Sequence, residues 1–419
     1  MNIKRLYKLY SDTFLVDTDT RKIRKDSIYF ALKGENFNGN IFAEEALLKG
    51  ASYSIIDEKK YKKSENYILV DDVLTTLQEL AAYHRKKLNI PIIALTGSNG
   101  KTTTKELIHA VLSKQYNISA TIGNLNNHIG VPLTLLAMTA DTEIGIVEMG
   151  ANHAKEIEFL CSIVHPDFGY ITNFGKAHLE GFGSITGVIK AKSELYAFLK
   201  ENHKTAFVNP VDSIQLEKSE GIKRVFFNTE KIRFLEVNPL VKISYNTKAI
   251  QSNLIGKYNY NNIAAAITIG EYFTVSDIKI KEALETYTPS NNRSQIIKKD
   301  SNTIILDAYN ANPTSMKAAL ESFLLIASEN KTVVLGDMFE LGANSAEEHQ
   351  NLINYTKSLQ FNNSYFIGNL FSKISHSKNT FKSFEEFSEH FSSQKIKNGY
   401  ILIKGSRGMA LERVLTLID

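Results

Sequence analysis

Short apolar runs alternate with longer amphipathic stretches along almost the whole chain of 419 residues. The apolar runs are rich in isoleucine, valine and leucine, as is typical of strands buried on both faces of a sheet. We expect such strands at 26–32, 51–56, 92–95, 118–121, 144–147, 168–172, 303–306, 331–335 and 400–403. We expect helices over 41–49, 73–87, 101–114, 186–201, 259–271 and 313–328. The alternation predicts an α/β fold with mostly parallel sheets and right-handed crossovers.

A chain of this length is too long for one hydrophobic core, so we expect several domains. The pattern divides it into an N-terminal region (1–88), a central region (89–288) and a C-terminal region (289–419). Residues 205–254 are expected to be further strands with polar connections. The predicted architecture is a parallel-sheet domain in the middle, flanked by a small α/β domain and a second open sheet.

The sequence Gly-Ser-Asn-Gly-Lys-Thr-Thr at 97–103 lies between a predicted strand and a predicted helix. Glycines at 97 and 100 let the backbone approach a ligand closely, and the helix start directs free N–H groups at one point. Lys101 would reach terminal phosphates, and the hydroxyl of Thr102 would hold Mg²⁺. The spacing Gly-x-x-Gly-Lys-Thr is two residues shorter than the common phosphate loop. We interpret this segment as a phosphate loop.

Other polar clusters follow strands of the central region and should lie at the same sheet edge. Asn124, Asn127 and His128 offer donors and acceptors without fixed charge, which suits a ligand rich in hydroxyls and amides or a structural loop. Glu148 ends an apolar strand, where a carboxylate can bind Mg²⁺. His178 follows the next strand and is either a ligand or a structural histidine, because Mg²⁺ prefers oxygen.

The C-terminal region has polar clusters of the same kind. Asp-Ala-Tyr-Asn-Ala-Asn-Pro at 307–313, Gly-Asp-Met-Phe-Glu-Leu-Gly at 336–342 and Lys-Gly-Ser-Arg at 404–407 each follow a predicted strand. All three should gather along one edge of a second parallel sheet. Such convergence is harder to attribute to packing than any single cluster.

Two helical segments are ambiguous from the residues alone. Asn259 and Asn262 begin a helix rich in alanine and isoleucine, where N-capping explains them as well as a ligand does. Lys192 lies among other charged residues, and the composition favours a solvated helix face.

Composition excludes several classes of protein. A formal charge of +4 does not require a nucleic-acid partner. No apolar run reaches the ~20 residues of a membrane helix, and the charged N-terminus is unlike a signal peptide. The single cysteine, Cys161, lies in an apolar helical pattern and is expected to be a core residue in a reducing compartment. We therefore expect a cytoplasmic protein.

The residues alone indicate an enzyme of phosphoryl chemistry and do not identify the acceptor. The phosphate loop, Gly-Asn-Leu-Asn-Asn-His-Ile-Gly at 123–130, Glu-Met-Gly-Ala at 148–151 and Asn-Phe-Gly-Lys-Ala-His at 173–178 together resemble the Mur ligases. The three C-terminal clusters are similar to those of the branch that adds D-alanyl-D-alanine to UDP-N-acetylmuramoyl-tripeptide. The resemblance is collinear over nearly the whole chain.

The resemblance implies an N-terminal domain for the UDP-sugar, a central ATPase domain and a Rossmann-like C-terminal domain. It further implies that ATP phosphorylates the tripeptide carboxylate and that the dipeptide amine attacks the acyl phosphate. Mg²⁺, in two ions, would assist, and Lys192 would be carbamylated. The expected partners are the two substrates, with no nucleic acid and no membrane span, and the protein would be a monomer.

Position by position, the resemblance assigns roles to residues of this sequence. The implied catalytic and metal positions are Lys101, Thr102, Glu148, His178 and Lys192. The implied ATP-binding positions are Gly97, Ser98, Asn99, Gly100, Lys101, Thr102, Thr103, Asn259, Asn262, Arg293, Asp307 and Asn310. The implied substrate-binding positions are Thr20, Arg21, Asn38, Asn124, Asn127, His128 and Lys404. From their residues alone, the loops that hold Thr20, Arg21 and Asn38 are equally typical of solvated turns.

Two departures from the family pattern and three alternative functions remain. Asn292 precedes Arg293 where the family usually has glycine, and Asn38-Gly-Asn replaces the usual Asp-Gly-His.

The ligase for the third peptide residue and folylpolyglutamate synthase share the central domain, but the Asp-Asn-Pro-Arg signature of the former does not occur here. A nucleotide switch would need Asn-Lys-x-Asp, and the Asn-Lys pair at 330–331 is followed by Thr-Val.

Overall fold

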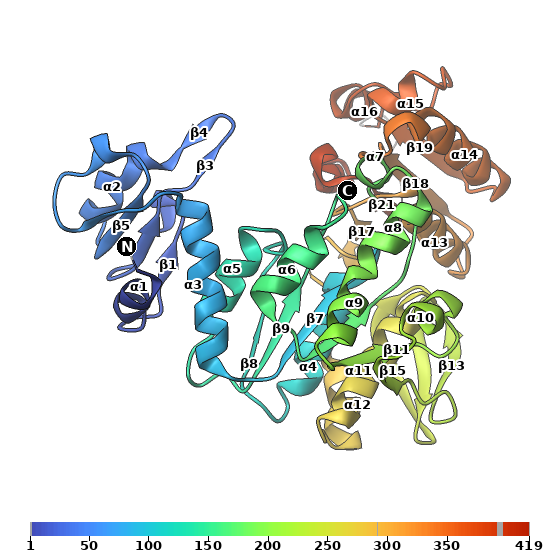
Figure 1. Ribbon diagram of the computed structural model, residues 1–419. Helices are drawn as coiled ribbons and strands as arrows, with labels where there is room; N and C mark the ends of the chain where they lie inside the picture. The colour runs from blue at the N-terminus through green and yellow to red at the C-terminus, as the bar shows by residue number, and fades with distance from the viewer. Residues whose placement is uncertain (1, 291, 392–396, 419) are drawn as a thin grey trace.

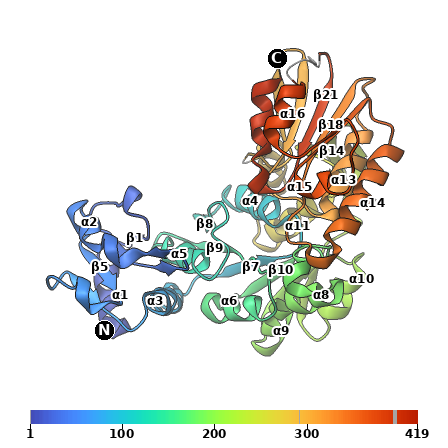
Figure 2. The same cartoon turned by 90° about the horizontal axis from the view of Figure 1, so that it is seen from above.

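The computed structural model describes residues 2–290, 292–391 and 397–418. The N-terminal region lies at one end of the molecule, and the C-terminal region lies across the central region from it (Figures 1 and 2). Each region contains its own parallel sheet. No helix of these described segments is both long enough and apolar enough to cross a bilayer.

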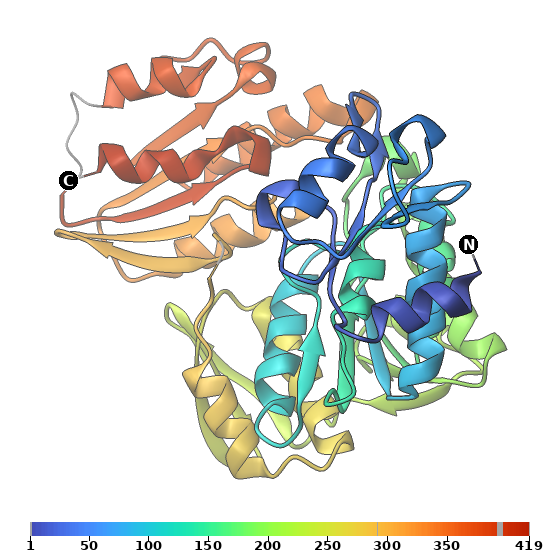
Figure 3. The ribbon, with the colours of Figure 1, turned by 90° about the vertical axis from the view of Figure 1, so that its left-hand side faces the viewer.

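The N-terminal region contains a four-stranded parallel sheet in the order β1-β2-β5-β6. Its elements are α1 (Ile3–Tyr10), β1 (Val16–Asp17), β2 (Ile28–Phe30), the hairpin β3 (Lys33–Gly34) and β4 (Phe37–Asn38), α2 (Ala43–Leu48), β5 (Tyr53–Ile56), β6 (Tyr67–Leu69) and α3 (Val73–Leu88). Asp72 caps α3, which packs against helices of the central region (Figure 3). The helix α3 therefore joins the two regions.

The central region is built on a six-stranded sheet in the order β12-β11-β10-β7-β9-β8, with every pair parallel. Its strands are β7 (Ile92–Thr96), β8 (Ile118–Ala120), β9 (Ile144–Glu148), β10 (Phe168–Ile171), β11 (Thr205–Val208) and β12 (Lys223–Phe226). Its helices are α4 (Lys101–Leu112), α5 (Gly130–Leu136), α6 (Glu156–Val164), α7 (Leu179–Phe182), α8 (Ile185–Lys192), α9 (Glu194–Glu201), α10 (Ser213–Lys218), α11 (Asn259–Tyr272) and α12 (Asp277–Thr286). An antiparallel sheet of β13 (Ile232–Val237), β14 (Leu240–Tyr245) and β15 (Lys248–Ile255) extends this region.

The C-terminal region has a six-stranded sheet in the order β16-β17-β21-β18-β19-β20, parallel except for the edge strand β16. Its strands are β16 (Gln295–Lys299), β17 (Asn302–Asp307), β18 (Lys331–Gly336), β19 (Asn363–Ile367), β20 (Thr380–Phe381) and β21 (Tyr400–Lys404). Its helices are α13 (Pro313–Leu324), α14 (Ser345–Ser358), α15 (Asn369–Ser372) and α16 (Phe384–Phe391). The predicted α/β class with parallel sheets is confirmed.

Several predicted elements were wrong in detail. The helix expected over 186–201 is two helices, α8 and α9, that meet at Ser193. The segment 205–254 also contains α10, and the helix expected at 41–49 begins as a 3₁₀ turn over Gly39–Phe42. The six-residue helix α10 is too short to show helical periodicity, which explains why the pattern did not reveal it.

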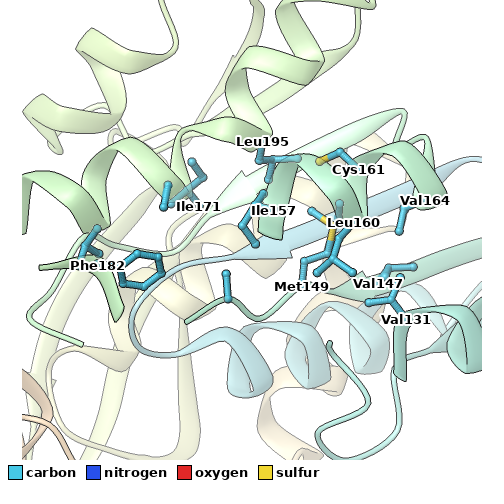
Figure 4. Close-up of a cluster of buried hydrophobic side chains, with 14 of the residues drawn as sticks. Val131, Val147, Met149, Ile157, Leu160, Cys161, Val164, Ile171, Phe182 and Leu195 are labelled. Carbon is cyan, nitrogen blue, oxygen red and sulfur yellow. The ribbon is translucent and has the colours of Figure 1, made fainter. Parts of the chain in front are cut away.

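The core beneath the central sheet fixes the elements that carry the site. Apolar side chains from α5, β9, α6, β10 and α9 meet there, among them Val131, Val147, Leu160, Ile171 and Leu195 (Figure 4). Cys161 lies in the same cluster and is fully buried, as expected. The strands that end at the site therefore rest on close-packed apolar contacts.

Burial raises the pKa of the Cys161 thiol far above its ordinary value. Because the thiolate is the reactive form, Cys161 should resist alkylation in the folded protein and react once the chain is unfolded. Iodoacetamide labelling followed by mass spectrometry, with and without denaturant, checks this expectation. Rapid labelling of the native protein would contradict the assignment of Cys161 to the core.

Candidate active site

The segment 97–100 forms a tight loop between β7 and α4. Gly97 has a φ of 141° and Gly100 a φ of 80°, which other residues rarely adopt. A Cβ atom on Gly97 would lie 2.0 Å from Thr172 Oγ1. Both positions therefore require glycine, and α4 begins at Lys101 with its N–H groups free of a side-chain cap. Free N–H groups at a helix start favour an anion, as predicted for a phosphate loop.

The end of β10 holds this loop in place. The Asn99 amide N–H donates to Asn173 Oδ1 at 3.1 Å, and the Asn99 carbonyl accepts from Thr172 Oγ1 at 2.6 Å and from Asn173 Nδ2 at 2.9 Å. The Ser98 hydroxyl donates to the Gly175 carbonyl at 2.9 Å. These bonds fix the loop backbone before any ligand binds.

Glu148 lies directly beside the loop because β9 pairs with β7 and Glu148 is in register with Leu95. Its side chain is 1% exposed, accepting from Thr102 Oγ1 at 2.9 Å and from Asn126 Nδ2 at 2.9 Å. A buried carboxylate beside a hydroxyl is an oxygen donor set of the kind that Mg²⁺ prefers. Asn126 lies in the segment 123–130 with Asn124, Asn127 and His128, but nothing in the sequence distinguished it as a site residue.

Lys101 extends from the first turn of α4, and its Nζ donates to the Gly97 carbonyl at 2.7 Å. Burial lowers its pKa, while the Glu148 charge opposes the shift. The amine therefore lies within the loop that would hold the phosphates.

A cavity of about 610 Å³ opens in front of the loop, between the central and C-terminal regions. Most predicted site residues line it, and they are Ser98, Asn99, Gly100, Lys101, Thr102, Thr103, Asn124, Asn127, His128, Glu148, His178, Asn259, Asn262, Arg293, Asp307, Asn310 and Lys404. The carboxyl ends of two separate parallel sheets thus face one space. Gly97 is not part of its wall.

The C-terminal wall of the cavity is an ion-paired cluster. Lys404 is 3% exposed, and its Nζ donates to Asp307 Oδ2 at 2.6 Å and to the Asn310 carbonyl at 3.0 Å. The Arg293 guanidinium stacks 3.7 Å from the centroid of the Tyr309 ring. The backbone N–H of Ser294 also donates to Asp307 at 3.1 Å. Asp307 neutralises Lys404, so the Arg293 guanidinium is the group of this cluster that offers positive charge to an anionic ligand.

Asn259 and Asn262, in the first turn of α11, form hydrogen bonds that connect this helix to α4 behind the phosphate loop. Asn262 Oδ1 accepts from Thr104 Oγ1 at 3.0 Å, and its Nδ2 donates to Asn259 Oδ1 at 2.8 Å. Asn259 in turn donates to the Ile255 carbonyl at 2.8 Å. Neither side chain caps α11, so the N-capping alternative is wrong.

Thr20, Arg21 and Asn38 do not reach this cavity, since none of its lining residues comes from the described part of the N-terminal region. Arg21 is paired with Asp19 at 2.6 Å on an exposed turn. Asn38 donates to Glu58 at 2.8 Å. All three residues lie in the N-terminal region, apart from the phosphate loop.

Lys192 is buried behind the cavity wall, contrary to the solvated face that composition favoured. It is 1% exposed, its Nζ donates to the Ala151 carbonyl at 3.1 Å, and it lies 5.2 Å from the centroid of the Phe182 ring. Burial, with the Lys101 charge nearby, lowers its pKa well below the ordinary value. Within the described segments, no carboxylate lies within ion-pair distance of this amine.

His178 faces the C-terminal region, with its Nδ1 2.5 Å from Glu340 Oε2. This contact lowers the pKa of Glu340. Throughout residues 2–290, 292–391 and 397–418, no group of three or more histidine, cysteine, aspartate or glutamate side chains could hold a metal ion. The sequence did not single out Glu340, which occurs in the predicted cluster at 336–342.

Two family models match the chain: the Mur ligase middle domain over residues 95–270, and the Mur ligase, glutamate ligase domain over residues 292–407. The UDP-N-acetylmuramoyl-tripeptide–D-alanyl-D-alanine ligase of Bacillus subtilis is 36% identical, over 96% of this chain and 92% of its own length. The chain belongs to the Mur ligase family. The predicted resemblance is thereby confirmed.

Solved structures agree with the assignment of this chain to the Mur ligase family. MurF from Acinetobacter baumannii superposes with a TM-score of 0.84 at 29% identity, covering 96% of this chain and 92% of that one. MurF from Thermotoga maritima in complex with ADP superposes with a TM-score of 0.83 at 27% identity, covering 96% of each chain. This Mur ligase therefore has the overall fold of MurF structures.

Proposed function

We propose that this Mur ligase uses ATP to join D-alanyl-D-alanine to UDP-N-acetylmuramoyl-tripeptide in peptidoglycan precursor synthesis. One observation carries the proposal: the phosphate loop with Glu148 and the wall with Asp307 and Lys404 enclose a single cavity. Similarity to MurF proteins over 96% of the chain supports the choice of substrates. The enzyme would act as a cytoplasmic monomer.

The reaction needs activation because a free carboxylate repels nucleophiles and has no good leaving group. A carboxylate oxygen of the tripeptide attacks the γ-phosphorus of ATP, and ADP leaves. The dipeptide amine then attacks the acyl carbon, loses a proton, and inorganic phosphate leaves. The chain would contribute alignment and charge. The loop N–H groups and Lys101 would contact the phosphates from one wall of the cavity, and Arg293 and Lys404 would contact the ligand from the opposite wall.

Mg²⁺ fits the residues at the loop. Thr102 and Glu148 present oxygen atoms to each other at 2.9 Å in a buried setting, and we propose that they hold the ion. Bound Mg²⁺ would neutralise charge on the transferred phosphoryl group. We propose His178 as a further metal position for a second ion. Its contact with Glu340 ties that position to the C-terminal region.

Lys192 fits a carbamate. An amine adds CO₂ only when it is neutral, and burial shifts Lys192 toward that form. Carbamylation, in which the neutral amine takes up CO₂ and releases one proton, would give an anion suited to Mg²⁺. We propose that this modification occurs on Lys192 in the active enzyme.

The remaining predicted positions are assigned to three ligand parts, within three domains at 1–88, 89–288 and 289–419. Asn259 and Asn262 support the nucleotide from below the loop, and Arg293, Asp307 and Asn310 approach it from the C-terminal wall. Asn124, Asn127 and His128 contact the muramoyl-peptide. Thr20, Arg21 and Asn38 hold the UDP end. Their distance from the phosphate loop is compatible with this role because the substrate is extended.

Phosphate release tests the proposal. ADP and phosphate should form only when UDP-N-acetylmuramoyl-tripeptide and D-alanyl-D-alanine are both present. Turnover without any acceptor would favour a nucleotide switch. Preference for a single amino acid would favour the third-residue ligase, and preference for glutamate with a folate would favour folylpolyglutamate synthase.

A further inference from the structure

One side chain of the C-terminal region reaches the phosphate loop directly. Asn312 Nδ2 donates to Asn99 Oδ1 at 2.7 Å, across a sequence separation of 213 residues. Asn312 is 4% exposed, and Asn99 lines the cavity. The hydrogen bond is therefore partly buried and joins the two walls of the site.

Asn312 is held in this orientation by a second interaction. It is the N-cap of α13, and its Oδ1 accepts from the Ser315 backbone N–H at 2.9 Å. The Ser315 hydroxyl in return accepts from the Asn312 backbone N–H at 3.1 Å, which completes a capping box. Because the cap uses the amide oxygen, the Nδ2 group is directed to Asn99.

The partner residue is equally constrained. The Asn99 backbone is bonded to Thr172 and Asn173, so the backbone from which its side chain extends is held with the loop. A Cβ atom on Gly175 would lie 3.1 Å from Asn99 Nδ2 and 3.3 Å from Thr314 Oγ1. Thr314 Oγ1 also accepts from the Lys176 backbone N–H at 3.1 Å. The phosphate loop, the segment after β10 and the start of α13 thus meet at one closely packed point.

We propose that Asn312 is a positioning residue, which sets the distance between the phosphate loop and the C-terminal wall through Asn99. The segment that precedes it, 307–311, contributes Asp307, Tyr309 and Asn310 to the cavity. Fixing Asn312 against the loop therefore fixes these side chains relative to the phosphates. The inference rests on the proposed function, and it assigns to Asn312 a larger effect on the ligation step than on nucleotide binding.

Two variants separate this role from helix capping. Asn312→Ser keeps a good N-cap but is too short to reach Asn99. Asn312→Asp keeps the cap and can accept from Asn99 Nδ2 after the Asn99 amide rotates. That nitrogen is buried and has no hydrogen-bond partner within the described segments, so rotation breaks no other bond it makes.

The experiment measures kcat and KM for D-alanyl-D-alanine, ADP affinity and Tm for the full-length wild type and both variants. We expect Asn312→Ser to lower kcat/KM for the dipeptide about tenfold, with a smaller loss of ADP affinity and with Tm nearly unchanged. Asn312→Asp should recover most of that loss. A purely structural role would instead lower Tm and leave the two variants alike.

The outcomes distinguish the two proposals. If the wild type ligates and Asn312→Ser has unchanged kcat/KM, or Asn312→Asp is as impaired as Asn312→Ser, the positioning role is overturned and the proposed function stands. If the wild type forms no ligated product, the proposed function fails, and the positioning role fails with it.

Discussion

Replacing Lys101 by methionine is expected to lower kcat by roughly 10²–10³-fold, because one preorganised positive charge facing the transferred phosphoryl group is lost. Methionine has a similar length and no charge, so the loop can keep its shape. The fold should persist, because the amine bonds to carbonyls of its own loop, such as that of Gly97 at 2.7 Å, and does not connect distant parts of the chain. Initial rates of phosphate release at saturating substrates measure the effect.

A matched control lies just beyond the same helix. Lys114 is paired with Glu282 at 2.7 Å, away from the cavity, and an exposed pair of this kind contributes at most about 1 kcal/mol. Lys114→Met should therefore retain wild-type turnover. Equal losses in the two variants, or full activity in Lys101→Met, would remove Lys101 from the phosphate site.

Replacing Lys192 by alanine should abolish most activity, and short carboxylic acids added to the assay should restore part of it. The truncated side chain leaves space in which a small carboxylate can take the place of the carbamate. Turnover measured against acetate or formate concentration checks this, with the wild type as the control that should gain nothing. Unimpaired turnover of Lys192→Ala would exclude Lys192 from the site.

A second variant shows that this loss does not come from misfolding. Lys192→Met removes a buried amine whose pKa is lowered from its ordinary value of 10.5. The native state of this variant therefore no longer carries the free-energy cost of burying the charged amine. At neutral pH the unfolded chain binds that proton and the folded chain does so less readily, which means that the lysine destabilises the fold there. Lys192→Met should therefore be inactive. In buffer free of CO₂, where the wild-type amine is unmodified, it should have a higher Tm than the wild type, and a lower Tm there would contradict this reading.

The sequence was sufficient to predict which edge of each parallel sheet faces the cavity. Apolar strands that end in polar clusters indicate which side chains share an edge, because the carboxyl ends of parallel strands lie together. Glu148 beside the loop and Asp307 across the cavity follow from that rule. The need for glycine at 97 and 100 could likewise be predicted, because a phosphate loop must bring its backbone close to the ligand. The structure agrees, since neither position has space for a Cβ atom.

Contacts between segments that are distant in the sequence could not be predicted in the same way. The burial of Lys192 depends on how α8 packs against the segment at Ala151, and local composition gave the opposite expectation. The bonds from Asn312 to Asn99 and from Glu340 to His178 depend on the placement of the C-terminal region, which no local periodicity encodes. Asn126 was missed because Asn124 and Asn127 are asparagines in the same loop, and the sequence does not show which of the three reaches Glu148.

The most direct test of the account is the mass of the product formed from UDP-N-acetylmuramoyl-tripeptide, ATP and D-alanyl-D-alanine. The account predicts a species heavier than the tripeptide nucleotide by one dipeptide less one water, with ADP and phosphate formed in equal amounts. ATP consumption that leaves the tripeptide nucleotide at its original mass would contradict it.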